Sequence, residues 1–481
     1  MKLLYKLQLF FFSILILACS DSNSDPTITP LPPDNTLPPN TPDYEITALL
    51  PYTQRIGDAQ KGYNYLITGD YMSSGIPYNA FLIGNGQNTD NILNRAGENA
   101  KIPHEFNAVK APNGVTVVAP NCLQCHSAQM NNKLIIGLGN STLDFSMNRM
   151  DYLNTLINGV RLLYGENSKE WDAFNTFKRN LEAVAPKTVT KSRGVNVADK
   201  STVAIISIRD KNTLEILDKP AIEVSDEVIP SDVPAWWLLK KKNAMFYPAI
   251  GRNDYCRIMI TMILSTLDDV EKAKEVDANF PDILAYIKNL EAPEYPHNID
   301  QALADQGKPI FLEKCSICHG TYGSSSSYPN FLVSLKTVGT DPALSNFYSQ
   351  PSVEMDYFKD WFNNGWFGQG TNALRGVTDG GYIAPPLDGV WATAPYFHNA
   401  SVPTIEDVLN SKNRPKYWRR SFESADYDQD KLGWKYTSET SQQDSNTYDT
   451  TQKGYGNQGH TFGDDLTAAQ RKSLLEYLKT L

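Results

Sequence analysis

Two short stretches of the sequence place two cysteines three residues apart, with a histidine directly after the second. They are Cys122-Leu-Gln-Cys125-His126 and Cys315-Ser-Ile-Cys318-His319. Two thiols at this spacing on one turn can both reach one edge of a porphyrin, and the imidazole that follows can then ligate the iron. The sequence therefore predicts two covalently bound haem c groups, with His126 and His319 as axial ligands.

Three other uses of these four thiols fit less well. A four-thiolate zinc site would not need a histidine after each pair. A thioredoxin-like dithiol normally opens a helix in a βαβ unit, and the sequence shows no such unit. A disulfide between residues three apart closes a small, strained ring that constrains little of the chain. Of the other two cysteines, Cys256 lies in an apolar helical stretch and is expected to be a buried, inert thiol.

The second ligand of the C-terminal haem must come from a small set of residues. Four further histidines occur, at positions 104, 297, 398 and 460, and no methionine follows Met355. If the C-terminal half is self-contained, its haem needs a second histidine. His460 is preferred because it lies in a glycine-rich loop before the last helix, where the backbone can approach a haem closely. His398, in Ala-Pro-Tyr-Phe-His398-Asn, is the alternative.

The first haem, at Cys122 and Cys125, has no comparable candidate for a second axial ligand nearby in the sequence. No histidine lies between His126 and His297, and Met130 is too close to His126 to reach the opposite face of the porphyrin. A histidine ligand would have to be His104 or come from the other half of the chain. We therefore expect an open or water-bound iron. An open position allows chemistry with dioxygen or peroxide, whereas a filled position allows electron transfer only.

The N-terminus indicates export. Two lysines precede an apolar run at residues 9–17, which is too short to span a bilayer and suits the core of a signal peptide. The run ends in Ala18-Cys19, so residues 1–18 are predicted to be a lipoprotein signal peptide and Cys19 the lipidated residue. An ordinary signal peptide cut nearby, with Cys19 incidental, is the alternative.

A tether is predicted to follow the lipidated cysteine. Residues 19–44 are rich in proline and acidic residues and have almost no apolar residue to bury, which is typical of a disordered spacer. The expected location is the outer membrane of a Gram-negative bacterium, on its periplasmic or its surface side. We expect contact with the membrane through the lipid anchor only.

Both motifs lie among segments that are expected to be mostly helical. The sequence therefore predicts a mainly α protein with two cytochrome-c-like haem domains. The N-terminal domain, residues 45–292, is enlarged by long loops, and the C-terminal domain covers residues 298–481. Helical spacing predicts helices near residues 149–164, 170–183, 254–269, 280–290 and 300–313, and a capping box at Thr467 predicts the last helix. A small β-hairpin is expected around residues 203–217, where a β-rich run is interrupted by Asp-Lys-Asn. A break at Ala292-Pro293 separates the domains.

Composition is typical of a globular protein. The chain has 481 residues, 41% of them hydrophobic, and a formal net charge of -10. A nucleic-acid partner is not expected, because nucleic-acid-binding proteins carry basic surfaces. Lys240 to Lys242, or Arg419 and Arg420, could pair with haem propionates, although most such runs are solvated. Trp236 and Trp237 could line a pocket or pack in the core.

Longer segments resemble a known family. The run from Ala384 to Leu409, APPLDGVWATAPYFHNASVPTIEDVL, is similar to the signature of the dihaem peroxidase superfamily. The segments IIGLGNSTLDF at residue 135, VGTDP at residue 338 and GHTFGDDL at residue 459 resemble the branch typified by dihaem rubber oxygenases. The resemblance covers most of residues 50–481.

The resemblance implies specific roles. His319 and His460 would be the two ligands of the second haem, His126 the proximal ligand of a first haem with a distal pocket for dioxygen, and His398 a residue beside the second haem. Two departures limit it. Peroxidases of this superfamily use a late methionine that this chain lacks, and rubber oxygenases are considerably longer, so the substrate does not carry over.

Two functions are consistent with these features. The first is an oxidoreductase whose N-terminal haem activates dioxygen or peroxide while the C-terminal haem transfers electrons. Its partners would be a redox protein or a small apolar or phenolic substrate. The second is a lipid-anchored dihaem electron carrier without catalytic activity. The occupancy of the first iron's far side separates them.

Overall fold

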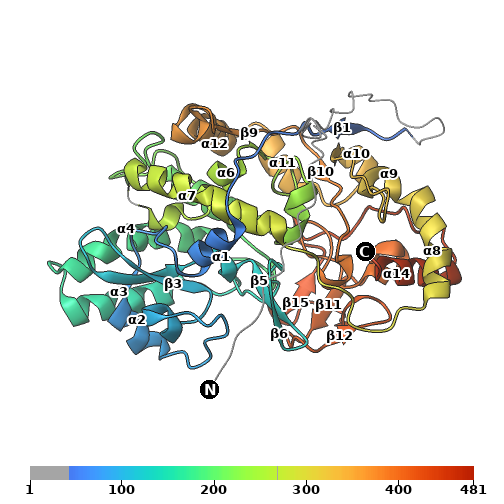
Figure 1. Ribbon diagram of the computed structural model, residues 1–481, viewed down its shortest axis with the longest axis horizontal. Helices are drawn as coiled ribbons and strands as arrows, with labels where there is room; N and C mark the ends of the chain where they lie inside the picture. The colour runs from blue at the N-terminus through green and yellow to red at the C-terminus, as the bar shows by residue number, and fades with distance from the viewer. Residues whose placement is uncertain (1–42, 268) are drawn as a thin grey trace, which may run out of the picture. The chain divides into compact units, whose positions relative to one another are not determined.

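The computed structural model describes residues 43–267 and 269–481 (Figure 1). The predicted signal peptide, Cys19 and nearly all of the predicted tether lie outside these residues. Within them, no helix is long and apolar enough to cross a membrane.

The C-terminal motif is framed by two helices that cross closely. Helix α8 (Gln301–Lys314) and helix α14 (Ala468–Leu478) pack against each other over much of their length. The close approach occurs at Gly307, where an added Cβ would lie 2.1 Å from the carbonyl oxygen of Ser473. Because only glycine leaves room there, Gly307 sets the distance between the helices. The predicted capping box is confirmed, with Thr467 and Gln470 bonding reciprocally.

A second helix pair repeats this arrangement in the N-terminal half. Helix α1 (Ala59–Thr68) packs against helix α7 (Val270–Asn289). At Gly62 an added Cβ would lie 1.8 Å from the carbonyl oxygen of Asp282. Both pairs therefore join a helix that precedes a cysteine motif to a later helix, with a glycine at the contact.

The remaining helices include three that overlap expected ones and others that the sequence did not predict. They are α2 (Tyr78–Asn85), α3 (Met150–Tyr164), α4 (Lys169–Val184), α5 (Ala198–Ser207), α6 (Tyr255–Thr261), α9 (Ser316–His319), α10 (Leu335–Val338), α11 (Ala343–Ser349), α12 (Val353–Asn364) and α13 (Ile405–Leu409). The 3-10 helices that matter for the sites are η2 (Cys122–Gln124), η4 (Trp236–Lys241) and η7 (Val390–Ala392). The predictions for α3, α4 and α8 are confirmed, and α8 contains Pro309 in its interior. The helix predicted over residues 254–269 ends at Thr261.

The hairpin expected around residues 203–217 is wrong. Residues 198–207 form helix α5, whose apolar side chains are buried on several sides. Only Arg209 and Ile216 pair, in an isolated antiparallel bridge. The β-branched residues that suggested a strand instead fill the core, because tertiary packing outweighs their weak intrinsic preference.

The described strands are short and form six small antiparallel sheets. In spatial order they are β1 (Ile46–Ala48), β8 (Phe331–Val333) and β10 (Tyr382–Ile383); β14 (Tyr436–Ser438), β11 (Tyr417–Arg420) and β15 (Thr447–Asp449); β2 (Ile76–Pro77), β4 (Thr116–Pro120) and β3 (Phe106–Lys110); β12 (Tyr427–Asp428) with β13 (Gly433–Trp434); β5 (Ser127–Met130) with β6 (Lys133–Ile136); and β7 (Gly251–Asn253) with β9 (Leu374–Gly376). Two sheets join the halves, since Thr47 pairs with Leu332 and Arg252 with Arg375.

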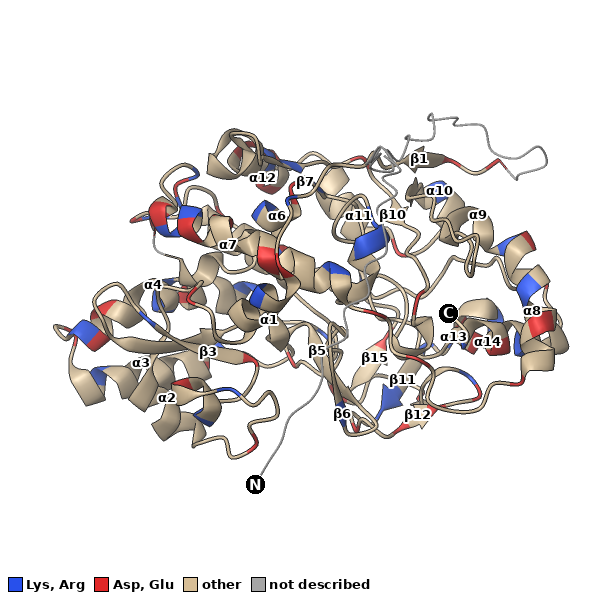
Figure 2. Cartoon of the chain, in the orientation of Figure 1, with Lys and Arg blue, Asp and Glu red and all other residues tan. Residues whose placement is uncertain are grey.

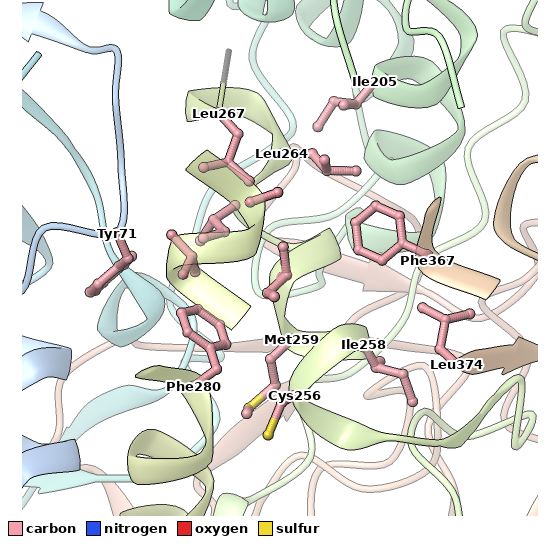
Figure 3. Packing of buried hydrophobic residues seen from close by; sticks show 14 of the residues in the cluster. Tyr71, Ile205, Cys256, Ile258, Met259, Leu264, Leu267, Phe280, Phe367 and Leu374 are labelled. Atoms are coloured by element: carbon pink, nitrogen blue, oxygen red, sulfur yellow. The ribbon is translucent and has the colours of Figure 1, made fainter. Parts of the chain in front are cut away.

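The largest hydrophobic core also draws on both halves of the chain. Phe280 and Ile258 of the N-terminal half share it with Phe367 and Leu374 of the C-terminal half (Figure 3). Cys256 is fully buried there as a free thiol, as expected. Acidic and basic residues are interspersed along exposed helices such as α7 and α8 (Figure 2). Such exposed ion pairs stabilise little individually, so the fold depends mainly on its buried contacts.

Candidate haem sites

The C-terminal cysteine motif lies where α8 gives way to the short helix α9. The backbone N–H of His319 donates to the carbonyl of Cys315 at 3.0 Å, so the motif forms one helical turn with its thiols on the same side. The Nδ1 atom of His319 lies 2.8 Å from the carbonyl oxygen of Pro385. A carbonyl only accepts, so Nδ1 carries the proton. This contact leaves Nε2 free for iron and fixes the ring orientation.

His460 faces His319. The two ring centroids are 6.2 Å apart, with 56° between the ring planes. A metal–imidazole bond is about 2 Å long and the bonding nitrogen lies about 1 Å from its ring centre, so two imidazoles on opposite sides of one metal have centroids about 6 Å apart. The observed spacing matches this arrangement. Burial lowers the pKa of His460 to about 3, which keeps its imidazole neutral and able to ligate.

The loop that carries His460 is held by backbone contacts. The backbone N–H of His460 donates to the carbonyl of Val338 at 2.7 Å, and the Arg414 side chain donates to the carbonyls of Gly459 and His460. A Cβ at Gly459 would lie 2.1 Å from the carbonyl carbon of Gly339, and φ at Gly459 is +75°. Glycine is therefore required for the loop to approach the chain at Gly339.

Both histidines line one cavity of about 240 Å³. Its walls include Cys315, Cys318, His319, His460 and Phe397, and otherwise are mainly apolar. Covalent haem c needs two thiols and an adjoining imidazole, and the second imidazole and the apolar lining suit a six-coordinate haem. The residues present therefore fit the group.

His398 lines the same cavity but is held differently. Its ring stacks on Tyr382 at 3.9 Å between centroids, and its carbonyl accepts from the N–H of Asp232 at 2.6 Å. It is buried, and burial lowers its pKa to about 3. Among the described ring contacts, His319 meets His460 and not His398. The structure thus brings His460, the preferred candidate, opposite His319.

The N-terminal motif forms a turn of the same kind. The N–H of His126 donates to the carbonyl of Cys122 at 3.1 Å, and Asn121 caps the turn. The thiol of Cys125 lies 3.6 Å from the side-chain nitrogen of Asn196. The two thiols and the imidazole are therefore arranged as in the C-terminal motif.

The partner of His126 is an indole instead of an imidazole. The rings of His126 and Trp236 stack with 4.6 Å between centroids and 21° between planes. Among the described residues, no second histidine ring contacts His126. Burial lowers the pKa of His126 to about 3, so its imidazole is neutral. Core packing was one of the two roles expected for Trp236. The structure shows that Trp236 is buried and packs against His126.

The other histidines are engaged elsewhere. His104 lies beside the N-terminal motif, but its Nε2 is 3.0 Å from the hydroxyl of Ser127 and its Nδ1 is 3.3 Å from the carboxylate of Glu105. His297 is exposed and contacts Tyr295. Both ring nitrogens of His104 thus have other partners, and no described ring contact joins His297 to His126.

The four thiols do not converge on one point. Within the described residues, no group of three or more His, Cys, Asp or Glu side chains could hold a bare metal ion. All four motif cysteines are free of disulfide bonds. The arrangement thus favours haem over the zinc and disulfide alternatives.

Two loops with matching backbones meet at the wall of the C-terminal cavity, and the sequence analysis did not detect them. Residues 245–251 and 396–402 each close with an isolated antiparallel bridge, Met245 with Gly251 and Tyr396 with Val402. Each has a phenylalanine and, three residues later, an alanine at positive φ, which is uncommon outside glycine. Tyr247 takes the place of His398, and the two rings contact each other at 6.4 Å. The shared Phe-x-x-Ala spacing was the available signal.

Tyr247 is tied to a second residue that the sequence analysis did not single out. Its hydroxyl donates to the carboxylate of Asp232 at 2.7 Å. Burial raises the pKa of Asp232 to about 7. Both residues lie in the wall of the C-terminal cavity.

Most of the predicted propionate partners are paired with protein carboxylates. Lys240 pairs with Glu291, Lys241 with Asp388 and Arg419 with Asp444. Arg420 is buried and donates to Ser141. Lys242 is different, since it lines the C-terminal cavity and no described side chain accepts from its ammonium.

Comparison with known proteins supports the haem assignment. Residues 381–419 match the RoxA-like, cytochrome c-like family. The matched segment includes His398 and much of the cavity wall. It supports a c-type cytochrome related to that family and implies covalently bound haem c.

Two uncharacterized proteins of Sinorhizobium fredii (strain NBRC 101917 / NGR234) are also similar. Protein y4iJ is 30% identical over 253 residues, covering 40% of this chain and 41% of the relative. Protein y4iM is 25% identical over 293 residues, covering 52% of this chain and 64% of the relative. The chain thus spans less than two thirds of either relative.

Proposed function

We propose that this protein is an exported dihaem c-type cytochrome that acts as an oxidoreductase. Its N-terminal haem, on His126, would leave one iron face open to dioxygen or peroxide. Its C-terminal haem, on His319 and His460, would transfer electrons. We place the chain in the rubber-oxygenase-like branch of the dihaem peroxidase superfamily.

One observation carries this proposal: the two proximal histidines have different partners. His319 faces His460 at the spacing of a shared metal, whereas His126 stacks on Trp236 and contacts no other histidine ring in the described chain. A haem with two imidazoles is saturated and suited to electron transfer. A haem with one imidazole keeps a position for an external ligand.

The two helix crossings support two cytochrome-c-like domains. Gly62 against Asp282 and Gly307 against Ser473 place a glycine at corresponding contacts. The matching loops at residues 245–251 and 396–402 support the same division. The halves nevertheless share a core and two sheets. We therefore expect them to unfold together, and the boundary at residues 292–298 stays a prediction.

The protein's own residues would perform distinct tasks at the two sites. When bound, the haem would supply the redox and ligand-activating chemistry. The carbonyl of Pro385 holds the proton of His319 on Nδ1, which leaves Nε2 available to hold the iron of a bound haem. Trp236 restricts rotation of the His126 imidazole and keeps water from that face. The largely apolar lining of the cavity at His319 would limit solvent access to the haem and so influence its reduction potential.

Partners and location belong to the same proposal. We expect a redox protein or a small apolar or phenolic substrate, with dioxygen or peroxide as co-reactant. We expect the lipid on Cys19 to hold the protein at the outer membrane of a Gram-negative cell.

A carbon monoxide difference spectrum of the dithionite-reduced protein tests the central point, with haem content fixed by the pyridine haemochrome method. We expect two haems per chain and one carbon monoxide bound per two haems. If no carbon monoxide binds, both irons are capped, and the protein is an electron carrier. If two bind, His460 is not a stable ligand of the reduced iron.

A further inference from the structure

Lys242 is a cation without a counter-charge in the wall of the C-terminal cavity. Its side chain is half-buried, and Lys242 is one of the residues that line the cavity, together with Cys315, Cys318, His319 and His460. Within the described residues, no acceptor bonds to its Nζ atom. Burial lowers the pKa of Lys242 to about 8, and no acidic group offsets that effect.

The neighbouring lysines show that this position is unusual. Lys240 pairs with Glu291 and Lys241 with Asp388, at 2.6 Å and 2.7 Å. Lys314, the other lysine of the cavity wall, pairs with Asp465 at 2.6 Å. Among the described cavity-lining residues, Lys242 is therefore the one cation without a carboxylate partner.

An ammonium that is partly withdrawn from water and has no partner is costly, so this position favours an anion inside the cavity. Asp232 also lines the cavity, but it accepts from Tyr247 and forms no ion pair with Lys242. The anion must therefore come with the molecule that fills the cavity. A haem attached at Cys315 and Cys318 brings two propionate carboxylates on the porphyrin edge opposite its thioether bonds.

We propose that the Nζ atom of Lys242 is the counter-ion of one propionate of the haem on His319. This inference rests on the proposed haem assignment and adds a cofactor-binding residue from the other half of the chain. Lys242 directly follows η4, the helix that carries Trp236 and its contact with His126. One short segment thus touches the proximal ligand of the first haem and the propionate of the second.

The pair has a definite electrochemical consequence. Reduction adds one negative charge to the haem, and a nearby cation stabilises that charge by Coulomb attraction in a mainly apolar cavity. Removing the cation while the propionate stays should therefore favour the oxidised haem. The midpoint potential of the His319 haem should fall.

The test is a spectroelectrochemical titration of the low-spin haem in the full protein carrying Lys242→Met. We expect the ratio of reduced to oxidised haem at a fixed potential to fall at least tenfold, which is about 59 mV for a one-electron couple. Lys240→Met is the matched control. It removes the same charge from a lysine two residues earlier in the chain, whose side chain does not line the cavity. Lys242→Arg, which keeps the charge, should stay close to the wild type.

An equal potential in Lys242→Met and Lys240→Met overturns the proposal. If Lys242→Met yields too little haem-loaded protein, Lys242→Gln provides the same test with a polar side chain of lower hydrophobicity. An unchanged potential in that variant also overturns the proposal.

Failure of the haem assignment gives a different result. In that case the wild-type protein itself lacks a covalently attached, low-spin haem at Cys315 and Cys318, as shown by haemochrome content and spectrum. Failure of the Lys242 inference leaves that haem intact with an unaltered potential.

Discussion

The imidazole of His126 lies flat against the indole of Trp236, 4.6 Å between centroids and 21° between planes. The corresponding imidazole of His319 faces His460 instead, at 6.2 Å. Two copies of one cysteine motif are thus placed in two environments. The difference predicts that the two haems differ in ligation, and hence in spin state and reactivity.

Trp236→Ala should destabilise the protein and loosen the proximal side of the first site. Trp236 is buried, and truncating such a ring leaves a cavity that costs about 3–5 kcal/mol. Urea unfolding measures the loss, and resonance Raman spectroscopy of the iron–histidine stretch reports the freed imidazole. Trp236→Phe should keep most of both properties. An unchanged iron–histidine band in the alanine variant would mean that the stacking does not orient His126.

His460→Ala should convert the second haem to a ligand-binding form. Loss of one imidazole leaves the iron five-coordinate, so the low-spin spectrum should become high-spin and carbon monoxide binding should rise from one to two per two haems. His398→Ala is the control and should keep the low-spin spectrum, because His398 stacks on Tyr382 and not on His319. The reverse pattern would make His398 the ligand.

Gly307→Ala should weaken the crossing of α8 and α14. The new methyl group would meet the Ser473 carbonyl at 2.1 Å, so the helices must separate, at a cost of about 1–3 kcal/mol. Gly159→Ala in α3 is the matched control, since nothing lies within 4 Å of its added Cβ. That change should stabilise by about 0.4–1 kcal/mol through the unfolded chain. Equal effects of the two changes in chemical denaturation would argue against a tight crossing.

Asp232 should make stability depend on pH. Burial raises the pKa of Asp232 to about 7 in the folded protein, whereas the pKa of an aspartate in an unfolded chain is about 3.9. The folded state binds this proton more tightly. Its contribution to stability is therefore full below about pH 4 and is lost as the pH rises towards 7.

Comparison with Asp232→Asn isolates this effect. The wild type should lose on the order of 1–2 kcal/mol relative to the variant between about pH 4 and 8, discounted because the carboxyl is only half-buried. Urea unfolding at a series of pH values measures the difference. A difference that stays constant over this range would show that the Asp232 carboxyl titrates normally in the fold.

Much of the local structure follows from sequence because its causes are local. The cysteine–histidine spacing specifies one turn with two thiols on one side, and Thr467 with Gln470 specifies the start of α14. Apolar periodicity correctly indicated α3 and α4, since 3.6-residue spacing is a property of the segment itself. The run at residues 203–207 misled for the opposite reason, because burial on several sides removes the periodicity that separates helix from strand.

The sequence by itself determined which groups could bind two haems: four thiols, two adjoining imidazoles and a short list of further histidines. Tertiary structure decided which of these groups meet. His319 and His460 are 141 positions apart (460 − 319), and His126 meets Trp236 across 110 positions (236 − 126). Such contacts arise from the packing of whole helices and loops, as at Gly459 against Gly339. In the sequence, Lys242 is the third of three consecutive lysines and cannot be told apart from the other two. Only the fold shows that it has no carboxylate partner and lines the cavity.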